Sequence, residues 1–172
     1  MFFVVSPRKF VLMNIFTLGL YWTYWFYRNW SQYRNKTGER VLPLVRTFFG
    51  ALFLYGLLNR VDRQLRLAGQ HHAWSPFWLT FACILTGLLS IGANWMAGVM
   101  PLMHLVVLVL IIPSLWLCAI MQKSVNLCSG DPEGKSNSRF SASNWMWISL
   151  GILLWGANTY LILVSGPLWY PE

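Results

Sequence analysis

The chain of 172 residues is 56% apolar and only 10% charged. A soluble domain of this size would have too little polar surface to cover itself, so we expect the lipid bilayer to be the solvent for most of the chain. The net charge of +8 would suggest nucleic acid as the partner of a soluble protein, but nearly all the cations flank apolar runs. They are better explained as orientation signals and contacts to lipid headgroups, and we expect no nucleic-acid partner.

The first region, residues 1–30, is strongly apolar from residue 6 onward. About 18 residues separate Lys9 from Arg28, and as one helix they would reach roughly 27 Å, barely the thickness of a hydrocarbon core. Thr17 and Gly19 interrupt the stretch near its middle, where a re-entrant helical hairpin would turn. No small-x-small cleavage site follows, so we expect the segment to be retained rather than removed as a signal peptide.

A second apolar run covers residues 43–58, but Arg46 interrupts it and Arg60 follows it. About 13 residues, or roughly 20 Å of helix, separate these arginines, which is short for a full span unless both side chains snorkel. Residues 57–69 then alternate apolar and basic positions at helical spacing. This pattern predicts a basic amphipathic helix that lies in the membrane interface and ends at Gly69.

The remaining half of the chain contains long apolar segments without Asp, Glu, Lys or Arg. Their lengths predict spanning helices over 76–95, 100–121 and 144–165, with tryptophans at their ends as in interfacial aromatic belts. The intervening residues 122–143 are polar and predict an exposed connection. We therefore expect an all-α, polytopic helical membrane protein in which residues 1–172 form a single membrane domain.

The cations also predict an orientation. Cations precede the first of these three segments and recur in the loop 122–143. They are missing from the loop between the first two segments and from the tail after the third. The loop is therefore expected to be cytoplasmic and the C-terminus outside. Carrying this alternation back through two ordinary spans would place the basic linker after residue 30 outside, against the same rule. We expect at least one early run to fold back. The alternative is five spans with an outward basic linker.

Residues 6–30 read S-P-R-K-F-V-L-M-N-I-F-T-L-G-L-Y-W-T-Y-W-F-Y-R-N-W. This stretch resembles the N-terminal signature of a family of small, functionally uncharacterised bacterial inner-membrane proteins, S-P-x-K-F followed by T-x-G-L-Y-x-x-Y-W-x-Y-x-N-W. The resemblance is close over residues 6–30 and extends over the rest of the chain only in hydropathy profile. It implies a polytopic protein of the bacterial inner membrane, and it supplies no catalytic residues.

Two sets of residues are candidate sites. A surface for lipid headgroups or a partner would combine aromatic rings with arginines, although a plain aromatic belt with snorkelled arginines explains the same pattern. Its residues are Tyr21, Tyr24, Trp25, Arg28, Arg46, Arg60, Arg63 and Arg66. A ladder of small and weakly polar residues predicts a helix-packing face, either within the chain or toward a second copy. Its residues are Ala82, Thr86, Ser90, Asn94 and Gly98.

These features favour an integral inner-membrane protein of structural, interaction or lipid-organising type with a basic cytoplasmic surface. Its expected partners are anionic lipids and a second copy or another membrane protein. A small channel or transporter subunit is the first alternative, but the predicted spans lack the Asp and Glu that proton or cation coupling uses. A lipid-modifying enzyme is the second alternative. No residues have a recognised catalytic or metal-binding spacing, no cofactor is expected, and the three cysteines predict free thiols.

Overall fold

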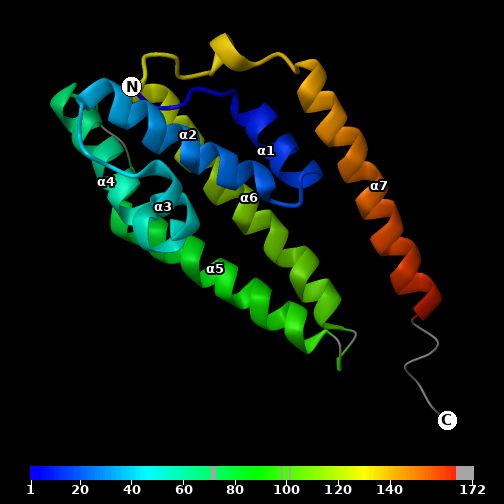
Figure 1. Cartoon of the computed structure of the whole chain (residues 1–172). Coiled ribbons are helices and arrows are strands. Elements are labelled where there is room, and N and C mark those ends of the chain that lie inside the picture. The colour runs from blue at the N-terminus through cyan, green and yellow to red at the C-terminus, as the bar shows by residue number, and fades with distance from the viewer. Residues whose placement is uncertain (71–72, 98, 101, 166–172) are drawn as a thin grey trace.

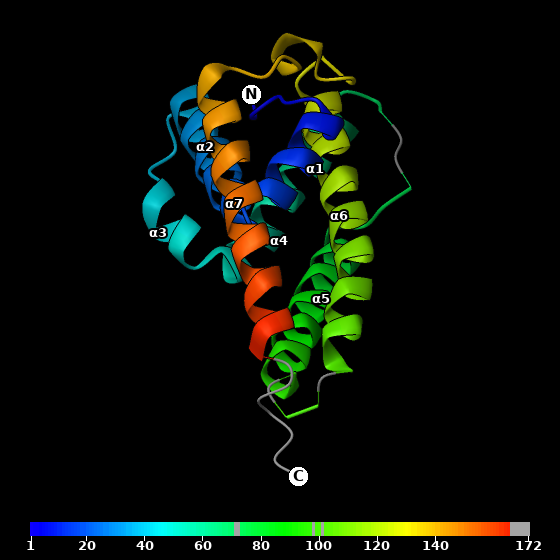
Figure 2. The same cartoon turned by 90° about the vertical axis from the view of Figure 1, so that its right-hand side faces the viewer.

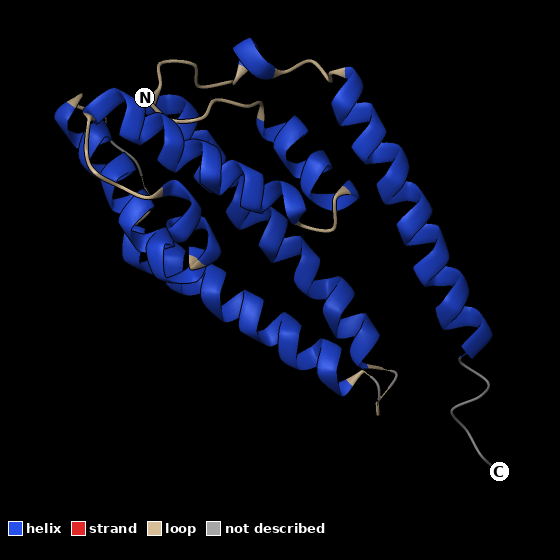
Figure 3. Ribbon diagram, in the orientation of Figure 1, coloured by secondary structure: helices blue, strands red, loops and turns tan. Residues whose placement is uncertain are grey.

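The computed structural model describes residues 1–70, 73–97, 99–100 and 102–165, and in this part of the chain helices are joined by loops, with no strand (Figures 1 and 3). It confirms the predicted all-α fold. The helices, in chain order, are α1 (Pro7–Phe16), α2 (Leu20–Thr37), α3 (Pro43–Phe48), α4 (Gly50–Leu67), α5 (Pro76–Met96), α6 (Met103–Cys128), the short 3-10 helix η1 (Lys135–Asn137) and α7 (Ala142–Ser165).

Helices α5 and α6 are long and apolar enough to cross a membrane. In the most apolar part of each, only 22% of the α5 residues and 6% of the α6 residues are buried inside the molecule. The core helix of a soluble protein would be mostly buried, so these outward apolar side chains fit a lipid solvent better than water. The third predicted span is the helix α7, which forms over nearly the expected range. Its crossing of a membrane stays a prediction.

The predicted loop 122–143 is wrong at its start, because α6 continues through Cys128. Gln122, Val125 and Asn126 are fully buried rather than exposed. The connection to α7 therefore covers only residues 129–141 and includes η1. Polar residues at the end of an apolar helix resembled a loop, but here they pack against a distant part of the chain.

The first apolar stretch is not one helix. It divides into α1 and α2 at Thr17–Gly19, where Leu18 and Gly19 adopt left-handed φ angles of 52° and 85°. The ring of Phe10 lies 5.4 Å from that of Trp25, so the two helices run antiparallel as a hairpin (Figure 1). The chain thus reverses at the interruption identified in the sequence.

The second apolar run is also interrupted, at Phe49 between α3 and α4. Helix α4 then continues to Leu67, so residues 43–58 and 57–69 are not the two separate elements that the sequence predicted. On α4 the predicted apolar positions Leu57, Val61 and Leu65 are fully buried. The helix ends just before Gly69, which has a φ of 67°, as expected for a glycine-terminated helix.

Different helix ends and connections lie at the two ends of the molecule. The start of α1, the C-terminal ends of α2, α4 and α6, and the connection 129–141 lie at one end (Figures 1 and 2). The end of α5, the start of α6 and the end of α7 lie at the other. The turn of the α1–α2 hairpin lies between the two ends, so this hairpin covers only part of the length of α6.

Helix α1 packs between α6 and α7. Its contact with α7 is close, because a Cβ atom added at Gly151 would overlap the backbone carbonyl of Phe16. One turn further along α7, the indole nitrogen of Trp155 donates a hydrogen bond to the carbonyl oxygen of Ile15 at 3.0 Å. Carbonyl groups at the end of a helix need partners, and Trp155 supplies one where α1 ends.

We expect Gly151→Ala to weaken the packing of α7 on the hairpin, with Gly156→Ala as the matched control. Both changes favour a helix interior by about 1 kcal/mol, but only the methyl group at Gly151 meets backbone, whereas the surroundings of Gly156 are open. Overpacking costs about 1 to 3 kcal/mol. Thermal unfolding in detergent should show a lower midpoint for Gly151→Ala and no decrease for Gly156→Ala. Equal midpoints for the two variants would contradict this crossing.

Candidate functional site

Residues 2–5 form an extended segment before α1, and side-chain amides bind its backbone. Asn29 Oδ1 accepts the N–H of Phe3 at 3.0 Å. Asn126 accepts the N–H of Val5 at 3.3 Å and donates to its carbonyl at 2.9 Å. Gln122 donates to the carbonyl of Phe3 at 3.2 Å and to Asn126, and its own oxygen accepts the indole N–H of Trp25. These amides replace the partner strand that an extended segment normally requires.

This network explains why polar residues lie inside an apolar protein. Asn29, Gln122 and Asn126 are all fully buried, and a buried amide is stable only when its hydrogen bonds are made. These three amides hold the segment 2–5, and its residues Phe2 and Phe3 belong to the hydrophobic core. The sequence offered one signal that was missed, the amides at the polar end of α6 following an apolar run.

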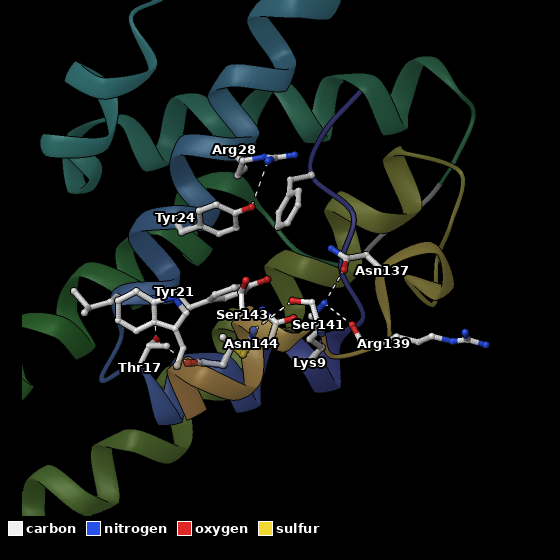
Figure 4. A pocket seen from close by; sticks show the side chains of 14 residues that line it. Lys9, Thr17, Tyr21, Tyr24, Arg28, Asn137, Arg139, Ser141, Ser143 and Asn144 are labelled. Atoms are coloured by element: carbon white, nitrogen blue, oxygen red, sulfur yellow. Dashed lines mark hydrogen bonds between the residues drawn. The ribbon is translucent and has the colours of Figure 1, made fainter. Parts of the chain in front are cut away.

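A cavity of about 630 Å³ lies beside this segment, between the α1–α2 hairpin, the end of the connection 129–141 and the first turns of α7 (Figure 4). Its wall combines apolar and aromatic side chains with cations, hydroxyls and amides. The lining residues are Phe3, Lys9, Met13, Thr17, Leu20, Tyr21, Tyr24, Arg28, Asn137, Arg139, Ser141, Ser143, Asn144 and Trp147.

Lys9 is only 5% exposed, although it carries a charge. Its Nζ donates to Asn137 Oδ1 at 2.8 Å and to the backbone carbonyl of Arg139 at 2.7 Å (Figure 4). Burial lowers the pKa of Lys9 from its usual range, because the charged form loses hydration. Lys9 thus links α1 to the connection 129–141 through neutral acceptors.

Arg28 lies on the opposite wall of the cavity (Figure 4). Its guanidinium carbon is 5.1 Å from the ring centre of Phe3 and 5.7 Å from that of Tyr24, and Nη1 lies 3.3 Å from the Tyr24 hydroxyl. Contacts with aromatic faces hold a guanidinium in place without neutralising it. The side chain of Arg139, by contrast, points away from the cavity in Figure 4.

No acidic residue of the described part of the chain lines the cavity. Glu39 and Asp62 pair with arginines of α4 at 3.3 and 3.0 Å, and Glu133 pairs with a lysine at 2.8 Å. Asp131 accepts two backbone N–H groups of the connection, and these bonds lower its pKa. Lys9 and Arg28 therefore place positive charge on two opposite walls of the cavity.

The first turn of α7 forms the third wall. Ser141 and Asn144 cap it reciprocally, since Asn144 Oδ1 accepts the N–H of Ser141 at 3.0 Å and Ser141 Oγ accepts the N–H of Asn144 at 3.3 Å. The side chains of Ser141, Ser143 and Asn144 line the cavity near Lys9 (Figure 4). The positive end of the α7 dipole adds to the positive charge of the wall.

The predicted aromatic and basic surface divides into separate groups. Tyr21, Tyr24 and Arg28 line the cavity. Trp25, from the same predicted set, is fully buried in the core and faces α6 rather than a ligand. Sequence spacing placed these residues on neighbouring faces of one helix, but it did not show that α1 and α6 cover part of that helix.

The other predicted arginines lie elsewhere. The guanidinium of Arg46 stacks on Trp30 at 4.0 Å, and that of Arg60 lies 5.2 Å from the same ring while pairing with Glu39. The sequence assigned Arg46 to a surface for lipid headgroups or a partner, and in the structure its guanidinium lies over an aromatic face. Arg66 pairs with Asp62, and Arg63 is exposed.

The predicted ladder of α5 only partly faces the interior. The hydroxyls of Thr86 and Ser90 donate to the carbonyls of Ala82 and Thr86, at 2.7 and 2.9 Å, so each is satisfied within its own helix. These three residues are half-buried, Asn94 is exposed, and Gly98 lies outside the described residues. Near the end of α5 the buried small residue is Ala93 instead.

Comparison of the chain with protein-family models, with curated proteins and with solved structures finds no match. The class of the protein therefore rests on its fold. The described part of the chain is helical, and two of its helices are long and apolar enough to span a membrane. Within residues 1–70, 73–97, 99–100 and 102–165, no three His, Cys, Asp or Glu side chains gather as metal ligands would.

We expect Asn126→Leu to destabilise the protein, because it removes the partners of both backbone groups of Val5. Each unsatisfied buried group costs about 1 to 3 kcal/mol, so the loss of two partners should lower the free energy of unfolding by roughly 2 to 6 kcal/mol. Thermal unfolding in detergent measures this loss. Asn94→Leu is the control at an exposed position of α5, and it should leave the midpoint unchanged. Similar midpoints for both variants would contradict a structural role for the amide network.

Proposed function

We propose that the chain is an integral protein of the bacterial inner membrane, of structural, interaction or lipid-organising type, with a basic cytoplasmic surface. The observation that carries this proposal is the separation of charge from apolar surface. Helices α5 and α6 present apolar side chains outward, and neither α5 nor α7 contains a Lys or Arg. A protein divided in this way fits a bilayer bounded by headgroups on one charged side.

The cations support an orientation for the proposed protein. They occur in the first four helices, in the last turns of α6 and in the connection 129–141. The basic stretch 29–42, which comprises the last turns of α2 and residues 38–42, lies in the same half of the molecule as this connection (Figures 1 and 2). We therefore place both in the cytoplasm, with the C-terminus outside, as the charge rule expects.

The two early apolar runs support the same arrangement. Neither run forms one continuous helix, because Thr17–Gly19 and Phe49 interrupt them. The α1–α2 hairpin returns to the end at which it began (Figure 1). Apolar side chains of α3 and α4, such as Phe48 at 85% and Leu52 at 76% exposure, would insert into lipid. In this proposal both runs enter the membrane from the cytoplasm without crossing it.

The N-terminal resemblance supports the assignment to the bacterial inner membrane. Within this class, interaction and lipid organisation fit best, because the charged groups lie at one interface rather than converging at the middle of α5 and α6. A basic surface of this kind attracts anionic lipids by about 1 kcal/mol per residue near the surface.

Cysteine labelling tests this proposal. In a cysteine-free background, Lys36→Cys and Lys135→Cys should react with a membrane-impermeant maleimide in inverted vesicles and not in intact cells. Val99→Cys, an 86% exposed position beside the end of α5, should show the reverse. The protein should also stay in the membrane pellet after alkaline carbonate extraction. Labelling of Lys36→Cys from outside would overturn the orientation, and release by carbonate would overturn membrane integration.

A further inference from the structure

We propose that the cavity between the α1–α2 hairpin and the start of α7 binds the phosphate group of an anionic phospholipid, with Lys9 and Arg28 as its cationic ligands. This inference rests on the proposed function and deepens it by naming a site and a ligand class. A free phosphate ester has the same anionic group, and the experiment below distinguishes the two sources.

Lys9 is the first reason to expect an anion. A cation that is 95% buried loses most of its hydration, and this loss is offset only partly by neutral acceptors. The ammonium group has three donors, and two of them bond to Asn137 and to the backbone of Arg139. The ammonium also lies 5.8 Å from the ring centre of Phe140. None of these partners carries a negative charge, so an anionic ligand that accepts the third N–H would supply the missing counter-charge.

Arg28 is the second reason. Phe3 and Tyr24 hold its guanidinium by their ring faces, and Nη1 donates to the Tyr24 hydroxyl at 3.3 Å. The in-plane N–H groups that do not make this bond can donate to a ligand. A guanidinium fixed in this way loses little entropy when its remaining N–H groups form hydrogen bonds with a phosphate. The acidic groups of the described part of the chain lie outside the cavity wall, so nothing on that wall competes for the two cations.

The third wall adds donors without adding charge. Ser141 and Ser143 lie near Lys9 at the start of α7 (Figure 4). Their hydroxyls can donate to phosphate oxygens, and the helix dipole favours a negative group at this end. Two cations on opposite walls and two hydroxyls, from three separate segments, thus line one cavity (Figure 4).

The rest of the wall selects a lipid over a soluble phosphate. Met13, Leu20 and Trp147 line the same cavity, and Leu20 and Trp147 are 62% and 42% exposed. Exposed apolar side chains of the cavity wall would contact acyl chains that leave the cavity for the bilayer. A volume of about 630 Å³ also exceeds what a phosphate group alone requires and leaves room for the attached glycerol.

The test measures binding of phosphatidylglycerol to the delipidated full chain in nonionic detergent by native mass spectrometry. The wild type should retain about one lipid, and phosphatidylcholine should bind much more weakly. The double variant Lys9→Met and Arg28→Met should bind phosphatidylglycerol about 100-fold more weakly, since each charged hydrogen bond contributes about tenfold. Arg8→Met removes an exposed cation of the same helix and should change binding less than twofold.

Three outcomes would overturn the proposal. One is equal loss of binding in Arg8→Met and in the double variant, which indicates general attraction to a basic surface. Another is equal binding of phosphatidylcholine. The third is competition by glycerol 3-phosphate at the same concentration as the diacyl lipid, which assigns the site to a soluble phosphate ester.

A second variant keeps the test valid if removal of Lys9 prevents folding. Ser143→Trp fills the cavity from an exposed position on α7 and leaves every charge in place. It should abolish retention of phosphatidylglycerol while the thermal midpoint stays near that of the wild type. Binding at the wild-type level in this variant would overturn the site. Carbonate extraction of membranes from cells that express the same variants tests membrane integration separately, so failure of the lipid site and failure of the proposed function are distinguishable.

Discussion

The structure depends on the hydrogen bonds that hold residues 2–5 against α2 and α6. An extended segment has no internal partners for its backbone, so it enters an apolar core only where side-chain amides replace a neighbouring strand. Asn29, Gln122 and Asn126 provide these partners from two helices. Because the segment leads directly into α1, these amides also determine where the hairpin begins and how Phe3 and Lys9 reach the wall of the cavity.

The sequence predicted the parts of the fold that depend on local rules. Apolar runs without charge predicted α5, α6 and α7, and Gly19 lies at the reversal between α1 and α2. It failed where distant residues decide the outcome. Gln122 and Asn126 resembled the start of a loop, but Asn126 bonds to a residue 121 positions away. No local pattern shows that such a partner exists, so the end of α6 was placed too early.

The residues of the candidate site also differ in whether a local pattern or a distant contact identifies them. Tyr21, Tyr24 and Arg28 were identified because they recur on one helix with aromatic and basic character. Lys9 had been treated as a flanking charge, and the start of α7 as an aromatic belt, because their meeting requires the hairpin and the connection 129–141 to lie together. Arg46 was identified because it interrupts an apolar run, but the sequence did not show that its guanidinium carbon would lie 4.0 Å from the ring centre of Trp30.

The cavity and the position of α7 depend on each other. Gly151 allows α7 to approach the end of α1. On the N-terminal side of this crossing, the first turn of α7 forms part of the cavity wall. Lys9 ties the connection that leads into α7 to the start of α1 through Asn137, whose amide also donates to the Val4 carbonyl at 3.0 Å. An anion on Lys9 would offset the cost of burying its charge without disturbing these bonds. Its binding free energy would therefore add to the stability of the same contacts that form the cavity.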